Sequence, residues 1–183
     1  MFVLLFVLII ALLFFPYIRR AFSRARFWRN FKNECILKRY RTRRLSFFAF
    51  YFCNLSDKFD IEVNTGRHLF AIKLWDEAGK NTNVIFAPGG RVYRRQKVAD
   101  VFGKDGKKSH SVLESKVGVF ALAKPRANDK KYACKYLITD GAANIYIYDG
   151  KEGTKVRNGG ELYGMTLLLR TDILKNISAK DVS

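Results

Sequence analysis

Acidic residues, cysteine and histidine are scarce in this chain of 183 residues, and each scarcity argues against a class of function. The chain holds 16 Asp and Glu residues against 34 Lys and Arg residues, which gives a formal net charge of +18. Such an excess indicates attraction to polyanions such as nucleic acid or acidic lipid headgroups. Cys35, Cys53 and Cys134 cannot all pair with one another, so we expect a reducing compartment.

The remaining polar residues predict neither a metal site nor a cofactor site. The two histidines, His68 and His110, have no second His, Cys or carboxylate nearby at the spacing of metal ligands. Residues 103–109 are rich in glycine but do not fit a phosphate-binding loop, because Lys108 stands where a magnesium-binding hydroxyl is needed. We therefore expect no cofactor and no bound metal.

One group of residues has the types that metal-dependent nucleases use. Asp60 and Glu62 share one face of a predicted strand, and Lys73 lies across the hairpin. A nuclease site needs a second acid two residues before the lysine, and Ala71 occupies that position. Ion pairing between the strands is the favoured interpretation. The sequence predicts no catalytic residue, and we expect a binding protein rather than an enzyme.

An uninterrupted apolar run extends from residue 1 to residue 15. With the next three residues it reaches Arg19 and Arg20, and as a helix it would cover about 27 Å, close to the ~30 Å hydrocarbon core of a bilayer. The sequence therefore predicts a transmembrane anchor at residues 1–18. The alternatives are a cleaved signal peptide, which should carry positive charge before its apolar stretch, and a helix of a soluble core.

Positive charge follows the predicted anchor, since residues 19–44 contain eleven Lys or Arg residues and a single acid, Glu34. By the positive-inside rule, the N-terminus would lie outside and the rest of the chain in the cytoplasm. We expect a single-pass membrane protein in which residues 19–44 form a basic, aromatic juxtamembrane segment. The predicted contacts with lipid headgroups are Arg19, Arg20, Arg24, Arg26, Trp28 and Arg29.

A strand-rich cytoplasmic domain is predicted at residues 45–177, followed by a tail at residues 178–183. The predicted class is α+β, with a single N-terminal transmembrane helix followed by a mainly antiparallel β domain with short helices. Strands are expected at residues 45–53, 81–88, 116–123 and 164–170, and a short helix is expected from Thr171 to Ile177.

Two predicted hairpins support the antiparallel class. In the first, Thr65 and Gly66 form a two-residue loop that pairs Val63 with His68 and puts the apolar side chains on one face. In the second, the dipeptide at 140–141 is Asp-Gly, which favours a tight turn between strands at 132–139 and 142–148.

Three arginines follow Pro88-Gly89-Gly90 and give a candidate anion site. Residues 91–102 have no clear period and are interpreted as a helix, whose first amides would assist the guanidinium groups. The predicted anion-binding residues are Gly89, Gly90, Arg91, Arg94 and Arg95.

Two functional classes follow from these patterns. The first is a membrane-tethered cytoplasmic binding or scaffolding module, in which residues 19–44 bind anionic lipid and the sheet recruits a cytoplasmic protein partner. The alternative is a membrane-associated nucleic-acid-binding protein that uses the same basic stretch and the arginines at 91, 94 and 95. The first class is favoured, because an anchor makes lipid the nearest polyanion.

Overall fold

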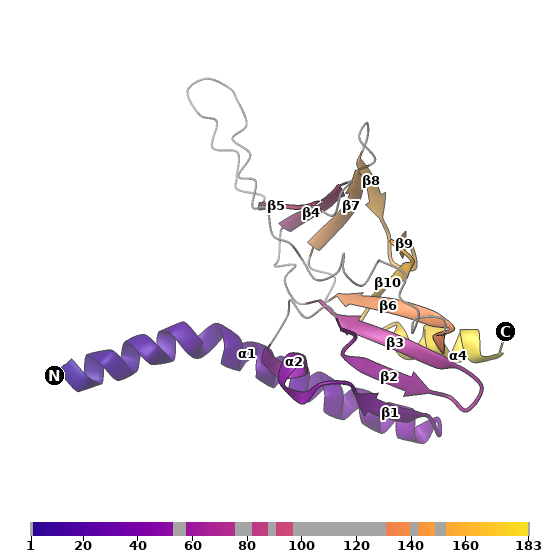
Figure 1. The fold of residues 1–183 in the computed structure, drawn as a ribbon, viewed down its shortest axis with the longest axis horizontal. Coiled ribbons are helices and arrows are strands. Elements are labelled where there is room, and N and C mark those ends of the chain that lie inside the picture. Colours follow the sequence, from indigo (N-terminus) through magenta and orange to yellow (C-terminus); the bar gives the residue numbers. More distant parts are fainter. Residues whose placement is uncertain are drawn as a thin grey trace.

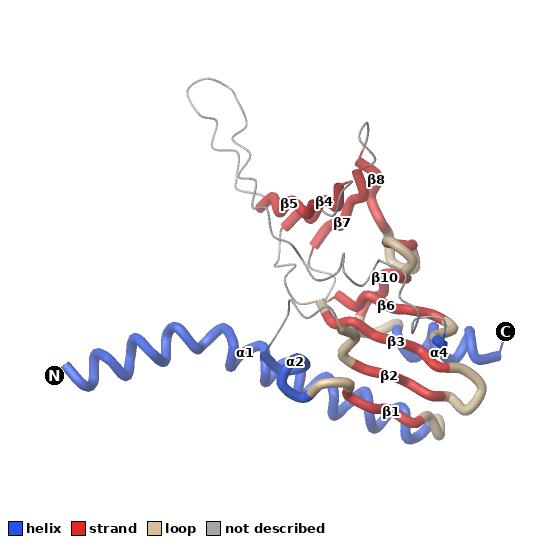
Figure 2. The backbone as a smooth tube through the Cα atoms, in the orientation of Figure 1, coloured by secondary structure: helices blue, strands red, loops and turns tan. Residues whose placement is uncertain are grey.

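Two β-sheets and three helices are formed by the residues that the computed structural model describes (Figure 1). The helices cover one face of the larger sheet, and the smaller sheet lies beyond its other face (Figure 2). The described residues are 2–52, 58–75, 82–87, 91–96, 131–139, 143–148 and 153–182.

Helix α1 (Phe2–Leu37) contains no glycine, and it runs through Pro16 into the basic stretch, where Arg and Ala, both strong helix formers, make up most of residues 19–26. A Schellman motif ends it. Arg39 has a φ of 60°, the Arg39 amide donates to the Ile36 carbonyl at 2.9 Å, and the Tyr40 amide donates to the Cys35 carbonyl at 2.8 Å. The chain then turns into strand β1 (Arg41–Arg44), which runs beside α1 (Figure 1).

The N-terminal segment corrects the membrane prediction. In the part of the chain that the structure describes, no helix is long and apolar enough to cross a membrane. The predicted transmembrane helix at residues 1–18, the single-pass topology, and the placement of the N-terminus outside with a cytoplasmic domain are therefore wrong. The structure instead has one continuous helix, α1, which runs through the basic stretch into the folded domain, where Phe31 and Cys35 are buried.

The larger sheet has six strands and is mixed. In spatial order they are β1, β2 (Ile61–Asn64), β3 (Leu69–Leu74), β6 (Cys134–Thr139), β10 (Met165–Leu169) and β9 (Glu161–Leu162). The first three strands form an antiparallel meander. β6 runs parallel to both of its neighbours, β3 and β10, and β9 pairs antiparallel with β10.

The smaller sheet has four strands and is mixed as well. Their order is β5 (Arg91–Gln96), β4 (Thr82–Ala87), β7 (Ala143–Tyr148) and β8 (Gly153–Val156). β4 and β7 are parallel, whereas the two outer pairs are antiparallel.

The prediction of a mainly antiparallel domain is therefore wrong, and the second predicted hairpin shows the reason. β6 and β7 do not pair with each other, although an Asp-Gly dipeptide lies between them. β6 already has a parallel neighbour on each edge, so the chain after Thr139 continues in the smaller sheet. A turn dipeptide favours a change of direction, but it does not select the partner strand.

The strand predicted at residues 45–53 is a helix instead, α2 (Phe47–Phe52). The Phe50 amide donates to the Ser46 carbonyl at 3.0 Å, and the Phe50 side chain is fully buried. Its ring centre lies 6.0 Å from that of Trp28 on α1. A short apolar run does not distinguish a buried strand from a buried helix, and here packing against α1 selects the helix.

The first hairpin forms, but its loop has four residues in place of two. Val63 pairs with Phe70, and the Thr65 amide donates to the His68 carbonyl at 3.1 Å. The shift is two positions, so the face of each side chain is unchanged and Ile61 is buried as expected. His68 lies in the loop, half-buried rather than on the core face.

The strands predicted at residues 81–88 and 164–170 are confirmed as β4 and β10. The predicted C-terminal helix forms as α4 (Ile173–Val182), and the Asn176 amide donates to the Asp172 carbonyl at 3.0 Å in its first turn. The helix does not end at Ile177 as predicted but continues through residues 178–182, which were predicted as part of a tail. Residues 116–123 lie outside the described residues.

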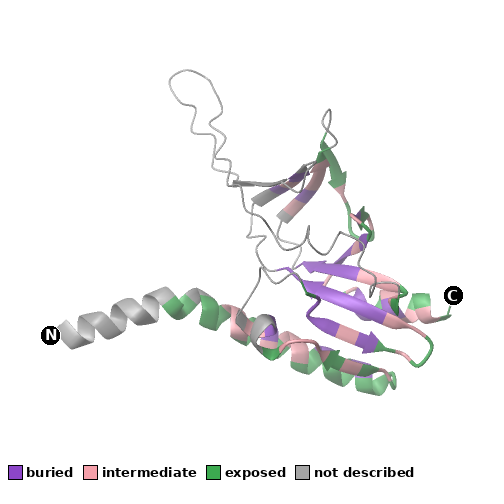
Figure 3. Ribbon diagram, in the orientation of Figure 1, coloured by how far each residue is buried: buried purple, intermediate pink, exposed green. Residues whose placement is uncertain are grey.

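Buried apolar side chains fill both faces of the larger sheet, whose central strands are the most buried part of the molecule (Figure 3). On one face, Ile72 and Ile138 belong to a cluster that includes Phe31 of α1 and Ile177 of α4. On the other face, Leu137 packs in a cluster with side chains of the smaller sheet. The first cluster fixes the rotation of α1 and therefore decides which of its residues face solvent.

Candidate anion-binding groove

Three arginines occupy the solvent face of α1. Arg19, Arg26 and Arg29 are separated by seven and three residues, which places them on one side of a helix. All three are exposed. Phe31 and Cys35 project from the opposite side and are buried against the sheet, so core packing turns the arginine face outward.

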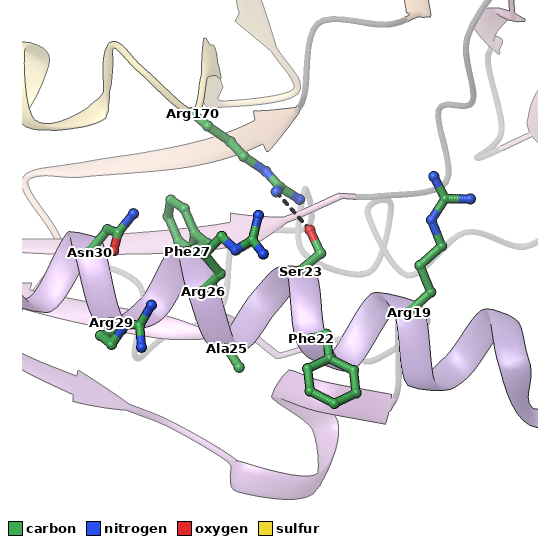
Figure 4. A pocket seen from close by; sticks show the side chains of 9 residues that line it. All are labelled: Arg19, Phe22, Ser23, Ala25, Arg26, Phe27, Arg29, Asn30 and Arg170. Atoms are coloured by element: carbon green, nitrogen blue, oxygen red, sulfur yellow. Dashed lines mark hydrogen bonds between the residues drawn. The ribbon is translucent and has the colours of Figure 1, made fainter.

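A groove of about 820 Å³ follows this face of α1 (Figure 4). The ring of Phe22 lies beside the arginines and is 72% exposed. None of the lining residues is acidic. They are Arg19, Phe22, Ser23, Ala25, Arg26, Phe27, Arg29, Asn30 and Arg170.

Arg170 reaches α1 from the turn after β10 and contributes a fourth guanidinium group (Figure 4). It donates a hydrogen bond to the Ser23 hydroxyl at 3.3 Å, and its Cζ lies 5.6 Å from the centre of the Phe27 ring. Its backbone amide donates to the Thr139 carbonyl at 3.2 Å, which fixes the point where the side chain leaves the sheet. The groove is therefore formed by residues of α1 and by one residue, Arg170, that follows the last residue of β10.

The lining residues of this groove are of the types that bind anions in proteins. Guanidinium groups are positively charged, and they bind phosphate oxygens through paired N–H donors. A concave surface of one sign concentrates the electrostatic field and attracts counter-ions. Within the described part of the chain, no group of three His, Cys, Asp or Glu residues could hold a metal ion.

Three of the six predicted headgroup contacts lie in the groove, namely Arg19, Arg26 and Arg29. Arg20 is half-buried and lies outside the lining. The other two face the domain. Arg24 is fully buried and donates to the Phe50 and Leu74 carbonyls, the second at 3.3 Å. Trp28 packs on Phe50 in the same region.

The second predicted anion site has a different structure from the one expected. Gly89 and Gly90 lie outside the described residues. Arg91, Arg94 and Arg95 belong to the strand β5, which pairs with β4 along its whole length, so there is no helix start at residue 91. β5 lies in the smaller sheet, away from α1 (Figure 1).

Sequence reasoning did not assign Phe22, Ser23, Asn30 or Arg170 to any site. The first three could be found by projecting residues 19–30 on a helix, because they fall on the same side as Arg26. Arg170 has no local indication, since it follows an ordinary apolar strand and is 147 residues from Ser23.

A second group of charges is buried beside the β2–β3 hairpin. Lys73 lies 3.4 Å from an Asp60 oxygen, and both side chains are 1% exposed. Asp60 also accepts the Leu74 amide at 2.8 Å, and Lys73 donates to the Lys58 carbonyl at 3.1 Å. Burial raises the pKa of Asp60, and the nearby Lys73 and Arg24 oppose that rise. The predicted ion pairing with Lys73 is confirmed for Asp60, whereas Glu62 pairs with Lys131 at 3.1 Å.

No protein-family model matches the chain, and no curated protein and no solved structure matches it either. The geometry of the groove is therefore the basis for any statement about function.

Proposed function

We propose that the chain binds nucleic acid through the groove on α1. The observation that carries the proposal is the set of four guanidinium groups, from Arg19, Arg26, Arg29 and Arg170, around one concave surface without an acid. Phosphate groups are the natural partners of such a surface, because each arginine can bind one with two parallel hydrogen bonds. The net charge of +18 supports attraction over a longer range.

Anionic lipid is the competing polyanion, and it was favoured only because an anchor would hold the chain at a bilayer. Without that argument, the shape of the site becomes the deciding feature. A recessed groove with a rim formed by Arg170 suits a narrow strand that enters it, whereas a membrane surface meets flat or protruding faces. The scaffolding module with a protein partner remains a prediction.

The test is binding of a fluorescent 20-nucleotide RNA or DNA over a series of salt concentrations, followed by anisotropy. The variant Arg19→Ala/Arg26→Ala/Arg29→Ala keeps good helix formers on exposed positions, so it should fold. We expect the variant to bind more weakly. The slope of log affinity against log salt concentration should become less negative by about 0.7–0.9 for each phosphate group that the variant no longer binds.

A matched control removes three exposed charges elsewhere, as Arg67→Ala/Lys155→Ala/Lys175→Ala. It should keep most of the affinity, since general attraction falls only slightly. Equal losses in both triple variants would show that net charge alone drives binding and would overturn the assignment to the groove. Tight binding to phosphatidylserine vesicles, with no binding to the oligonucleotide, would replace nucleic acid by lipid.

A further inference from the structure

The exposed aromatic ring in the groove separates two kinds of nucleic-acid ligand. Along α1, Phe22 lies between Arg19 and Arg26, three residues after the first and four before the second, and its ring points away from the Arg19 guanidinium group (Figure 4). Its ring is 72% exposed, which makes it one of the most exposed large apolar side chains in the described part of the chain. An exposed aromatic ring in a groove lined by arginines can stack on a flat partner whose phosphate groups bind those arginines.

Packing among the described residues does not use this ring. Neighbouring aromatic side chains of α1 do have such contacts. The Phe27 ring stacks on the Phe31 ring with centres 5.4 Å apart, and the guanidinium group of Arg170 lies over the Phe27 ring. Trp28 packs on Phe50. The ring of Phe22 points away from the helix (Figure 4), and most of its apolar area is exposed to solvent.

We infer that the groove takes single-stranded nucleic acid and that Phe22 stacks on an unpaired base; this inference rests on the proposed function. In a duplex, the faces of the bases are covered by their neighbours and only edges and phosphates are available. In a single strand, a base can turn out and stack on an aromatic ring while the adjacent phosphates meet arginines.

The dimensions of the groove agree with this ligand. Seven residues of helix separate Arg19 from Arg26, about 10.5 Å along the axis, and Phe22 lies between them. A volume of about 820 Å³ falls within the ~300–1,000 Å³ of sites that enclose small organic ligands, so a base with its sugar and phosphate has room beside the helix. Asn30, an exposed residue at the end of the groove, offers donors and an acceptor to a base edge.

The experiment compares Phe22→Ala with Phe22→Tyr on a single-stranded oligonucleotide and on its duplex. We expect Phe22→Ala to weaken single-strand binding about 5- to 150-fold, the equivalent of ~1–3 kcal/mol for a stacked base. The salt dependence should stay unchanged, because the variant keeps every arginine that binds phosphate. Phe22→Tyr should keep the affinity, and duplex binding should be weak in all three proteins.

Leu37→Ala is the control, since Leu37 is an exposed apolar residue of α1 outside the groove and its loss should leave affinity unchanged. If Phe22→Ala binds the single strand as well as the unchanged chain does, stacking is excluded even though the arginine triple variant still fails to bind. Preference for the duplex would also overturn the inference while leaving nucleic-acid binding intact. Absence of all oligonucleotide binding would remove both proposals.

Discussion

At the scale of single residues, the buried pair Asp60 and Lys73 has a large expected effect on stability. Both side chains are enclosed, so removing one charge leaves the other without compensation in a medium of low polarity. We expect Asp60→Asn to lower the free energy of unfolding by about 3–5 kcal/mol. Urea denaturation at pH 7, followed by circular dichroism, measures the change.

The double variant Asp60→Asn/Lys73→Met is the matched comparison. It removes both charges and keeps a side chain of similar length at position 73, so it should be more stable than Asp60→Asn alone. The single variant Lys73→Met completes the comparison. If the losses of stability in Asp60→Asn and in Lys73→Met simply add in the double variant, the two groups, 3.4 Å apart, do not interact energetically.

Glu62 gives a dependence of stability on pH. Burial opposes its ionisation, but hydrogen bonds from Lys131 and Tyr132, both 3.1 Å long, outweigh burial and hold the pKa of Glu62 below its ordinary value of 4.5. A carboxylate with a lowered pKa stabilises the folded state above that ordinary value, and the contribution disappears as the pH falls through the lowered pKa.

We therefore expect the unchanged chain to be more stable than Glu62→Gln at pH 7, with a difference that shrinks on acidification below pH 4.5. Urea denaturation at several values between pH 7 and pH 3 measures that difference. A difference that stays constant over this range would mean that the Glu62 carboxylate keeps an ordinary pKa in the folded protein.

At the scale of the elements, the end of α1 is a place where the sequence is not optimal. Arg39 adopts a φ of 60°, a left-handed conformation that costs a residue with a Cβ about 1–2 kcal/mol and glycine almost nothing. Glycine also makes the unfolded chain more flexible, which offsets about 0.4–1 kcal/mol of that gain. We expect Arg39→Gly to raise the free energy of unfolding by up to about 1 kcal/mol.

Thermal or urea denaturation of Arg39→Gly should be compared with Arg41→Gly, which removes the same charge from the exposed strand β1. Arg41→Gly should lower stability by about 0.5–1 kcal/mol, because glycine is unfavourable inside a strand. Destabilisation by both variants would show that the Schellman geometry imposes no strain on Arg39.

Some elements could be predicted from the sequence and others could not, for identifiable physical reasons. The β2–β3 hairpin has alternating apolar residues, so its faces follow from period-two geometry even when the loop length is misjudged. The segment that forms α2 has six consecutive apolar residues without a period, and only burial beneath α1 determines its structure. Residues 91–96 have no clear hydrophobic period, and they form the strand β5 because they pair with β4.

At the scale of the whole molecule, the partner of each strand depends on contacts that no local pattern contains. β3 and β6 are adjacent and parallel although about sixty residues separate them, and the Asp-Gly dipeptide after β6 misleadingly indicated a hairpin. In the groove, too, some residues follow from a local sequence pattern and one depends on a long-range contact. The arginines of α1 were recognised from their density, whereas Arg170 depends on where β10 ends in the sheet.

The contact between Ser23 and Arg170 also has a consequence for biosynthesis. α1 leaves the ribosome before α4, which lies more than a hundred residues further along the chain and belongs to the same apolar cluster as Phe31 and Cys35. Closing so long a loop carries an entropic cost that slows folding. A nascent chain therefore carries an incomplete groove, and its fourth guanidinium group arrives only after β10 has been inserted beside β6.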